Sequence, residues 1–145
     1  MKDSQPRAGP SRNQSEVFLP AFGHIEAERV LALDATFAVI RDRFPVSPGH
    51  ALIVPRRPVA LFTDLDENEE IALVRWLRWT QDHLAETLTP RPDAFNLGLN
   101  DGPAAGQTVA QLHFHVIPRY RGDVPDPRGG VRWVLPAKAA YWEQA

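Results

Sequence analysis

Hydrophobic and polar residues alternate along residues 110–117, a pattern typical of a β-strand that buries one of its faces. The apolar positions of this alternation are Leu112, Phe114 and Val116. The polar positions are Gln111, His113 and His115, which would share the opposite face, and Pro118 is predicted to end the strand. Three polar side chains in a row on one face of a hydrophobic strand suit a functional site better than a core.

Shorter apolar runs elsewhere in the chain predict the rest of a sheet. The expected strands are residues 29–33, 37–40, 51–54, 94–100 and 131–135. Along residues 94–100, Asn96, Gly98 and Asn100 would share one face, and Gly98 would leave room there for a ligand. If this segment pairs with residues 110–117, Asn100 lies at the mouth of the intervening loop, near the histidines.

A single long helix is predicted over residues 66–88. Asp66 suits the N-cap, Glu69 completes a capping box, and Pro90 stops the helix. An apolar stripe at helical spacing is expected to face the sheet. Its members are Ile71, Val74, Leu77, Leu84 and Leu88, widened by Leu73 and Trp76. The pattern predicts an α+β fold, an antiparallel sheet of about five strands with this helix on one face and the histidines on the other.

Length and composition are those of an ordinary soluble domain. With 145 residues, 43% of them hydrophobic, the chain is expected to form one domain over residues 17–145 after a disordered tail over residues 1–16. A net charge of −2 argues against a nucleic-acid binder that relies on bulk positive charge. The chain has no apolar run of membrane-spanning length and no cysteine for a disulfide or a Cys-type zinc site. A cytoplasmic location is expected, with no membrane partner.

The loop before the histidines and the histidines themselves indicate the chemistry. Residues 101–106 contain two glycines and a proline, so their backbone N–H groups can approach an anion. A neutral imidazole such as His113 is a competent nucleophile toward phosphorus if its second ring nitrogen is held by a fixed acceptor. The His-x-His spacing is equally common among metal ligands, with His50 as a third ligand. Asp101 and Asp123 are the nearest carboxylates in sequence, both in loops. These residues alone favour a nucleophile and a metal site about equally.

Asp42 and His50 stand at the two ends of the connection between the strands at 37–40 and 51–54. Both side chains can therefore face one cleft. Taken alone, Asp42 is better interpreted as a turn carboxylate.

These motifs resemble the signature of the histidine-triad (HIT) superfamily of nucleotide hydrolases and transferases. The signature is His-φ-His-φ-His-φ-φ, where φ is apolar, and residues 111–117 match it except that Gln111 stands at the first histidine position. The matching segments are Pro48-Gly49-His50 with residues 51–54, Asn100-Asp101-Gly102, Gly106-Gln107-Thr108-Val109 and Gln111–Ile117. The resemblance extends over roughly residues 18–122, most of the chain.

The resemblance implies a role for each polar residue. His113 would be the nucleophile, His115 would lie near the phosphate, and His50 would help to orient the site. Asp42 would accept from ribose hydroxyls. Gln111 stands where the family positions the nucleophile, and we expect retained chemistry with an altered rate, pH profile or leaving-group preference. The polar residues expected around the phosphates are Asn100, Gln107 and Thr108.

The predicted function is therefore nucleotide hydrolysis at the α-phosphate of an adenylated substrate, through a nucleotidyl-histidine intermediate that releases a nucleoside monophosphate. Dinucleoside polyphosphates are the leading purine nucleotide substrates, followed by AMP-amides. No protein-bound metal or other cofactor is expected, although Mg²⁺ can arrive with a polyphosphate. The resemblance also implies a homodimer. The alternatives are a non-catalytic nucleotide-binding module and, with less support, a His-ligated metal protein.

Two expectations concern the C-terminal region. Arg128 and Arg132 are expected to be solvated rather than to hold a distal phosphate. Tyr141 and Trp142 make the C-terminal tail aromatic, so the tail is expected to dock on the domain.

Overall fold

The computed structural model describes residues 16–144, so the predicted disorder of residues 1–15 lies outside the described residues. The strands within this range are β1 (Val17–Leu19), β2 (Gly23–Ile25), β3 (Val30–Leu33), β4 (Phe37–Arg41), β5 (Ala51–Pro55), β6 (Ala94–Gly98) and β7 (Phe114–Arg119). The α-helices are α1 (Glu67–Thr87) and α2 (Pro136–Ala139), and the 3-10 helices are η1 (Ala27–Arg29), η2 (Phe62–Asp64), η3 (Pro103–Ala105), η4 (Gly130–Val134) and η5 (Tyr141–Glu143).

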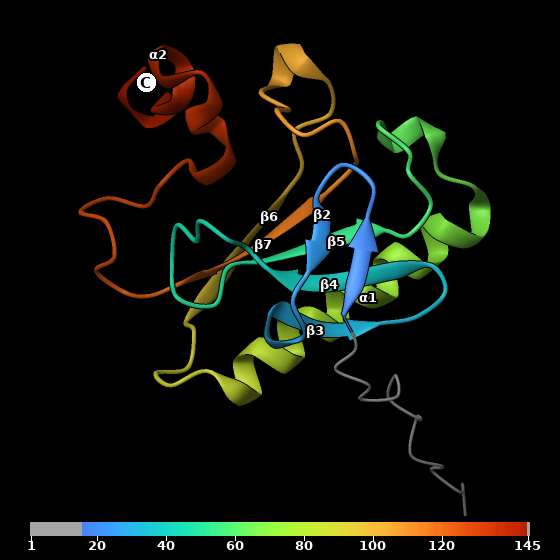
Figure 1. Ribbon diagram of the computed structural model, residues 1–145. Coiled ribbons are helices and arrows are strands. Elements are labelled where there is room, and N and C mark those ends of the chain that lie inside the picture. Colours follow the sequence, from blue (N-terminus) through green and yellow to red (C-terminus); the bar gives the residue numbers. More distant parts are fainter. Residues whose placement is uncertain (1–15, 145) are drawn as a thin grey trace, which may run out of the picture.

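Strands β3 to β7 form one antiparallel sheet in the order β3-β4-β5-β7-β6, and β1 and β2 form a separate hairpin (Figure 1). The predicted α+β architecture, with five strands and one long helix, is confirmed. Within the described residues no helix is long and apolar enough to cross a membrane.

Helix α1 begins and ends where the sequence predicts. Asp66 accepts from the Glu69 backbone N–H at 2.8 Å, and Glu69 Oε1 accepts from the Asp66 backbone N–H at 3.0 Å, which confirms the predicted capping box. The Glu69 carboxylate also pairs with Arg57, so this glutamate can be 6% exposed without leaving a charge unpaired.

The face that α1 buries overlaps the predicted stripe only in part. The buried residues of the helix are Glu69, Leu73, Trp76, Thr80 and Leu84. Ile71 and Val74, predicted to be buried, are 49% and 67% exposed. Thr80 was not predicted to be buried because threonine is polar. The Thr80 hydroxyl donates to the Trp76 carbonyl at 2.7 Å within the helix, so it has a hydrogen-bond partner in the buried position. The predicted stripe is thus confirmed for Leu73, Trp76 and Leu84 and wrong for Ile71 and Val74.

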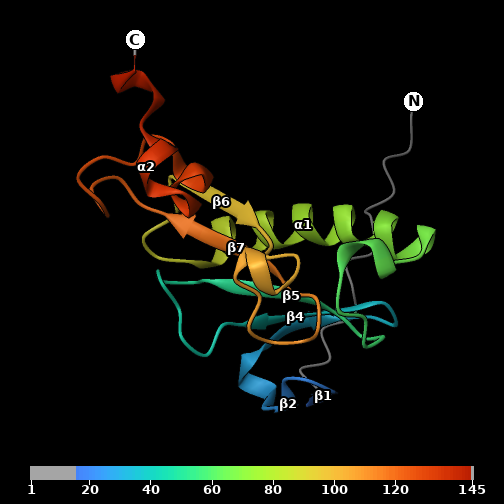
Figure 2. The same cartoon turned by 90° about the horizontal axis from the view of Figure 1, so that it is seen from above.

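Apolar side chains fill both sides of the sheet, with α1 on one side and the β1–β2 hairpin on the other (Figure 2). The helix-side core includes Phe37, Val39, Ile53, Leu73, Trp76, Leu84, Leu112 and Val116, with Phe114 packed against it. The predicted contact between the helix and the apolar face of the motif is confirmed. The hairpin-side core includes Leu19, Ile25, Ala38, Ile40, Leu52 and Val54.

Strand β7 differs from the prediction at both ends. It begins at Phe114, so Gln111 and His113 lie in the connection before it. It continues through Pro118, which was predicted to end it. The Pro118 carbonyl accepts from Ser47 Oγ at 2.7 Å, in the loop between β4 and β5. Because the N–H and C=O of a strand residue point to the same side, the missing N–H would face that loop rather than β6, and the ladder loses no bond.

Residues 131–135 were predicted as a strand, but they form most of η4 and its C-terminal cap. The Trp133 indole N–H donates to the Arg128 carbonyl at 2.8 Å, a local bond that favours a turn over an extended chain. The strand prediction was therefore wrong.

The C-terminal aromatic residues pack on the arginines around η4. The Arg128 guanidinium lies 4.4 Å from the centre of a Trp142 ring, and that of Arg132 lies 4.9 Å from the centre of the Tyr141 ring. Arg132 also donates to the carbonyls of Lys138 and Ala139. The aromatic residues thus pack on the neighbouring segment around η4 through both arginines, and the predicted docking of the tail on the rest of the domain stays a prediction.

Candidate active site

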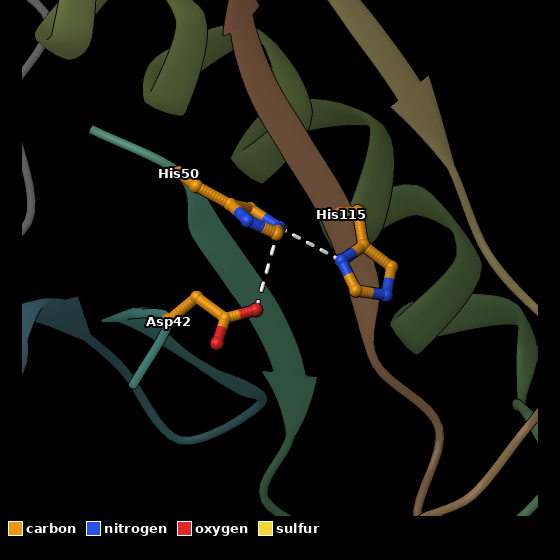
Figure 3. Close-up of side chains that lie close together, drawn as sticks. All are labelled: Asp42, His50 and His115. Atoms are coloured by element: carbon orange, nitrogen blue, oxygen red, sulfur yellow. Dashed lines mark hydrogen bonds and ion pairs between the residues drawn. The ribbon is translucent and has the colours of Figure 1, made fainter. Parts of the chain in front are cut away.

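Neighbouring strand ends bring the predicted polar residues together. Asp42 follows β4 and His50 precedes β5, and the Asp42 backbone N–H donates to the His50 carbonyl at 2.9 Å. His115 lies on β7 opposite Leu52 of β5. Figure 3 shows the His50 ring between the Asp42 carboxylate and the His115 ring. The three side chains therefore meet across strands that are distant in sequence.

The backbone fixes the tautomer of His50. Its Nδ1 accepts from the Val46 N–H at 3.2 Å, so the proton of the neutral ring is on Nε2. Nε2 lies 2.9 Å from His115 Nδ1 and 3.4 Å from Asp42 Oδ2. Burial lowers the pKa of His50, and the negative charge of Asp42 opposes this shift. The ring is therefore neutral near pH 7 and donates through Nε2.

The tautomer of His115 follows from that of His50. Because His50 Nε2 donates, His115 Nδ1 must accept, and the proton of neutral His115 is on Nε2. Burial first, and then the neighbouring His113 and His50 rings, lower the pKa of His115 to about 4. His115 thus presents an N–H on the side away from His50. Such a donor can bind a non-bridging phosphate oxygen or a leaving-group oxygen.

His113 has the opposite tautomer. Its Nδ1 lies 2.8 Å from the Gln111 carbonyl oxygen, which can only accept, so the proton is on Nδ1 and Nε2 carries a lone pair. The ring centre is 5.2 Å from that of His115, and the Phe22 ring meets it nearly at right angles at 5.3 Å. One nitrogen is anchored and the other is available, which is what an imidazole nucleophile requires.

The side-chain amide of Gln111 bonds to backbone groups. The side chain is fully buried, and its Oε1 accepts from the Ala21 N–H at 3.1 Å while its Nε2 donates to the Pro55 carbonyl at 2.9 Å. These bonds join the turn of the β1–β2 hairpin to the end of β5. Gln111 and His113 both contact the turn of the β1–β2 hairpin, through Ala21 and Phe22, whereas Leu112 lies in the helix-side core, as the predicted alternation requires, although the strand starts only at Phe114.

The loop between β6 and β7 holds the remaining predicted residues. Gln107 uses its side chain within the loop region: Oε1 accepts from the Gly102 N–H at 2.9 Å, and Nε2 donates to the Ala60 and Val109 carbonyls, both at 3.0 Å. Asn100 is half-buried and Thr108 is exposed. The predicted phosphate contacts of Asn100, Gln107 and Thr108 stay predictions.

Three side chains also offer ligand atoms at a spacing that a metal ion could use. Atoms of Asp42, His50 and His115 all lie within 4.8 Å of one another. The carboxylate near the histidines is thus Asp42, rather than Asp101 or Asp123 as the sequence suggested. His50 could bind a metal through Nε2 only if its proton moved to Nδ1, where the Val46 N–H already donates. The hydrogen-bond pattern therefore fits a metal-free site better.

Sequence reasoning missed two contacts that shape this site. Phe22 meets the His113 ring, and the Val46 N–H sets the tautomer of His50. An apolar residue just before the Gly23 turn signals that Phe22 packs somewhere, but the sequence does not indicate on what. The contribution of Val46 comes from its backbone, for which the side chain gives no signal.

Comparison with known proteins gives consistent matches. The family profile described as HIT domain matches residues 23–122. An asymmetrical bis(5'-nucleosyl)-tetraphosphatase of Schizosaccharomyces pombe is 36% identical over 91 residues, which cover 63% of this chain and 47% of that protein. An AP-4-A phosphorylase of Mycobacterium tuberculosis is 34% identical over 124 residues, which cover 84% of this chain and 60% of that protein. The chain thus spans between 47% and 60% of the length of these relatives.

Among solved structures, the NitFhit protein of C. elegans superposes with a TM-score of 0.70 at 27% identity. The match covers 92% of this chain and 31% of the NitFhit chain. The similarity therefore includes almost all of the described domain.

Proposed function

Because the chain belongs to the HIT domain family, we propose that it is a nucleotide hydrolase that acts at the α-phosphate of dinucleoside polyphosphates or adenylated compounds. It would release a nucleoside monophosphate through a nucleotidyl-histidine intermediate. The observation that carries this proposal is the pair of opposite tautomers, a lone pair on His113 Nε2 beside an N–H on His115 Nε2. The names of the two relatives support dinucleoside polyphosphates as the leading substrate class.

In the first step, His113 Nε2 attacks the α-phosphorus and forms an N–P bond. The bond from phosphorus to the leaving group breaks, and its electron pair departs with the leaving group. The imidazole becomes positively charged, and its Nδ1–H donates to the Gln111 carbonyl, which stabilises that charge. His115 Nε2–H donates to an oxygen on which negative charge develops, and Asp42 accepts from the ribose hydroxyls.

In the second step, water attacks the same phosphorus. The N–P bond breaks, its electron pair returns to His113 Nε2, and the water proton is released to solvent as the monophosphate departs. Attack by inorganic phosphate in place of water would instead release a nucleoside diphosphate. In this proposal Asn100, Thr108 and the backbone N–H groups of the loop surround the phosphates, while Gln107 keeps that loop in shape.

Product analysis tests the proposal. Purified protein is given diadenosine tetraphosphate or AMP-amide, with and without inorganic phosphate, beside His113→Asn and a control variant, His24→Asn. We expect AMP from the wild type and from the control, and a loss on the order of a thousandfold or more in His113→Asn. His24 is a matched control because it is exposed and paired with Glu16. Release of ADP only when phosphate is present would identify phosphorolysis.

A wild-type protein that binds AMP but releases none would show a non-catalytic nucleotide-binding module. A second candidate function, metal binding, is favoured by the spacing of Asp42, His50 and His115. Metal analysis of the purified protein tests it: bound zinc or iron that is lost in His115→Asn supports this candidate, and its absence in a metal-supplemented preparation contradicts it.

The other expectations stay predictions of this proposal. They are a homodimer, a cytoplasmic location, Mg²⁺ bound only with a polyphosphate substrate, and no nucleic-acid partner. The dimer is compatible with the sheet, because β6 lies at its edge and pairs only with β7 among the described residues. Light scattering of the purified chain gives its mass in solution and tests this prediction.

A further inference from the structure

A cavity of about 730 Å³ lies beside His115, over the β6–β7 half of the sheet. Its floor includes Gly98, which pairs directly with His115 and has no atom within 4 Å of the position where a Cβ would be. Its far wall comes from the C-terminal region and is largely apolar. The apolar residues of that wall are Val124, Pro127, Val131, Trp133 and Val134. The volume is in the range of small-ligand sites in proteins.

The cavity borders the histidines but not Asp42. His50 and His115 both line it, whereas Asp42, which follows β4, does not. Across the sheet, β4 and β6 lie on opposite sides of the β5–β7 pair. A substrate whose ribose meets Asp42 and whose α-phosphate meets the histidines can therefore extend its leaving group into the cavity.

The charges of the cavity wall are already paired. Arg119 is its only Lys or Arg within residues 16–144, and it donates to both carboxylate oxygens of Asp123 at 2.7 and 2.8 Å and to Asn96 Oδ1 at 2.6 Å. Asp126 pairs with Arg128 at 2.9 Å. A wall with paired charges and a 47% exposed indole at Trp133 suits a planar ring better than a chain of phosphates.

We propose that this cavity is the leaving-group subsite and that it binds an aromatic ring, stacked on Trp133. The proposal rests on the proposed function, because that function places the α-phosphate at the histidines. The ring is either the second nucleobase of a dinucleoside polyphosphate or the aryl group of an adenylated amine. Both present the same chemistry to Trp133, a flat apolar surface.

Two substrate pairs that differ only in the ring separate these sources. The first pair is diadenosine tetraphosphate and adenosine 5'-tetraphosphate, and the second is the anilide and the simple amide of AMP. Each is assayed with the wild type, Trp133→Ala and Trp133→Phe. The control is Leu135→Ala, because Leu135 belongs to the same segment, is 68% exposed and does not line the cavity.

We expect Trp133→Ala to lower kcat/KM about tenfold for the ring-bearing member of a pair and less than about twofold for its ring-free partner. Trp133→Phe retains most of the preference, since the ring remains and only the indole N–H bond to Arg128 is lost. Leu135→Ala matches the wild type. The pair that responds identifies the source of the ring. An equal loss for both members of each pair, or no loss for either, overturns the proposal.

A binding measurement keeps the two proposals distinguishable. Protein labelled with 5-fluorotryptophan is titrated with adenosine, and the Trp133 resonance is assigned from its absence in Trp133→Phe. A saturable shift of that resonance, unchanged in Leu135→Ala, supports the ring subsite even if none of the four substrates is cleaved, an outcome that would refute only the hydrolase. A Trp133 resonance that does not respond to adenosine overturns the subsite, whatever the turnover.

Discussion

Gln111 and His115 stand four residues apart in one motif, and the structure uses them in opposite ways. Gln111 is fully buried and bonded on both sides of its amide to backbone groups, Ala21 and Pro55. His115 is half-buried, lines the cavity and shares a hydrogen bond with His50. The comparison shows that equal spacing in a motif does not mean equal roles: the side chain of Gln111 holds backbone segments together, and that of His115 lines the cavity.

The largest expected effect is on stability at the scaffold position. Replacing Gln111 with Met keeps the volume but leaves the buried Pro55 carbonyl without its donor and releases the Ala21 N–H. We expect the free energy of unfolding to fall by about 2–4 kcal/mol, measured by urea denaturation. The control is Gln144→Met, because Gln144 is exposed and should change stability by less than about 0.5 kcal/mol. A loss in Gln111→Met no larger than in the control would refute the scaffold role.

For His115, the expected effect is a dependence of stability on pH. The pKa of His115 is lowered from 6.5 to about 4 in the folded protein, so the unfolded chain takes up a proton first as the pH falls. This contribution to stability is fully present above pH 6.5 and is lost as the pH falls toward 4. Burial lowers the pKa of His50 as well, and its contribution has the same sign.

Urea midpoints measured across this pH range test the expectation. We expect a steeper loss of stability in the wild type than in His115→Asn, which removes one of the titrating rings. Parallel curves for the two proteins would mean that the folded environment does not disfavour the charged form of His115.

The variant Gln111→His places an imidazole, the side chain found at position 115, in the buried position of the Gln111 amide. A neutral imidazole has one donor and one acceptor, enough for the two bonds that the amide makes here, so stability near pH 7.5 should stay within about 1 kcal/mol of the wild type. An imidazolium cannot accept from the Ala21 N–H, so the variant should lose about 1 kcal/mol more than the wild type near pH 5. Denaturation curves at both pH values measure the difference. A constant difference between the proteins would show that the ring does not replace the amide in these bonds.

The smallest expected effect concerns Phe22, which joins the two regions. It follows Ala21, which Gln111 holds, and its ring packs edge-on against the His113 ring. Phe22→Leu should lower kcat by about two- to tenfold, the scale of one aromatic pair. Phe18→Leu is the control, since Phe18 lies on the same hairpin and is 67% exposed. Equal kcat values for the two variants would show that the contact between Phe22 and His113 does not contribute to turnover.

The parts of the fold that sequence could predict are those set by near neighbours. The ends of α1 were predicted because the capping box involves residues three positions apart, Asp66 and Glu69. The strand connection allowed Asp42 and His50 to face one cleft, but taken alone it favoured a turn carboxylate, and the site role of Asp42 came from the HIT resemblance. Buried Thr80 shows the limit of the hydrophobic pattern, because its hydroxyl is satisfied by the helix itself.

The hydrogen-bond partners of the Gln111 side chain are distant in sequence and could not be predicted. Ala21 is 90 residues away in sequence and Pro55 is 56, and both bind through backbone atoms. Neither partner carries a side-chain signal that could be recognised in the sequence. The cavity beyond His115 was hidden for a similar reason, since its wall is η4, which the pattern predicted as a strand.

The pairing of β7 on both sides affects which part of the site unfolds locally first. His115 has a strand partner on each side, Leu52 and Gly98, so exposing its backbone requires two ladders to separate together. His113 precedes the strand, next to Leu112, whose N–H donates to the Val59 carbonyl in a loop. Local unfolding should therefore reach His113, the proposed nucleophile, before it reaches His115. Amide exchange would be faster at His113 than at His115, so His113 could change its position while its neighbour stays fixed in the sheet.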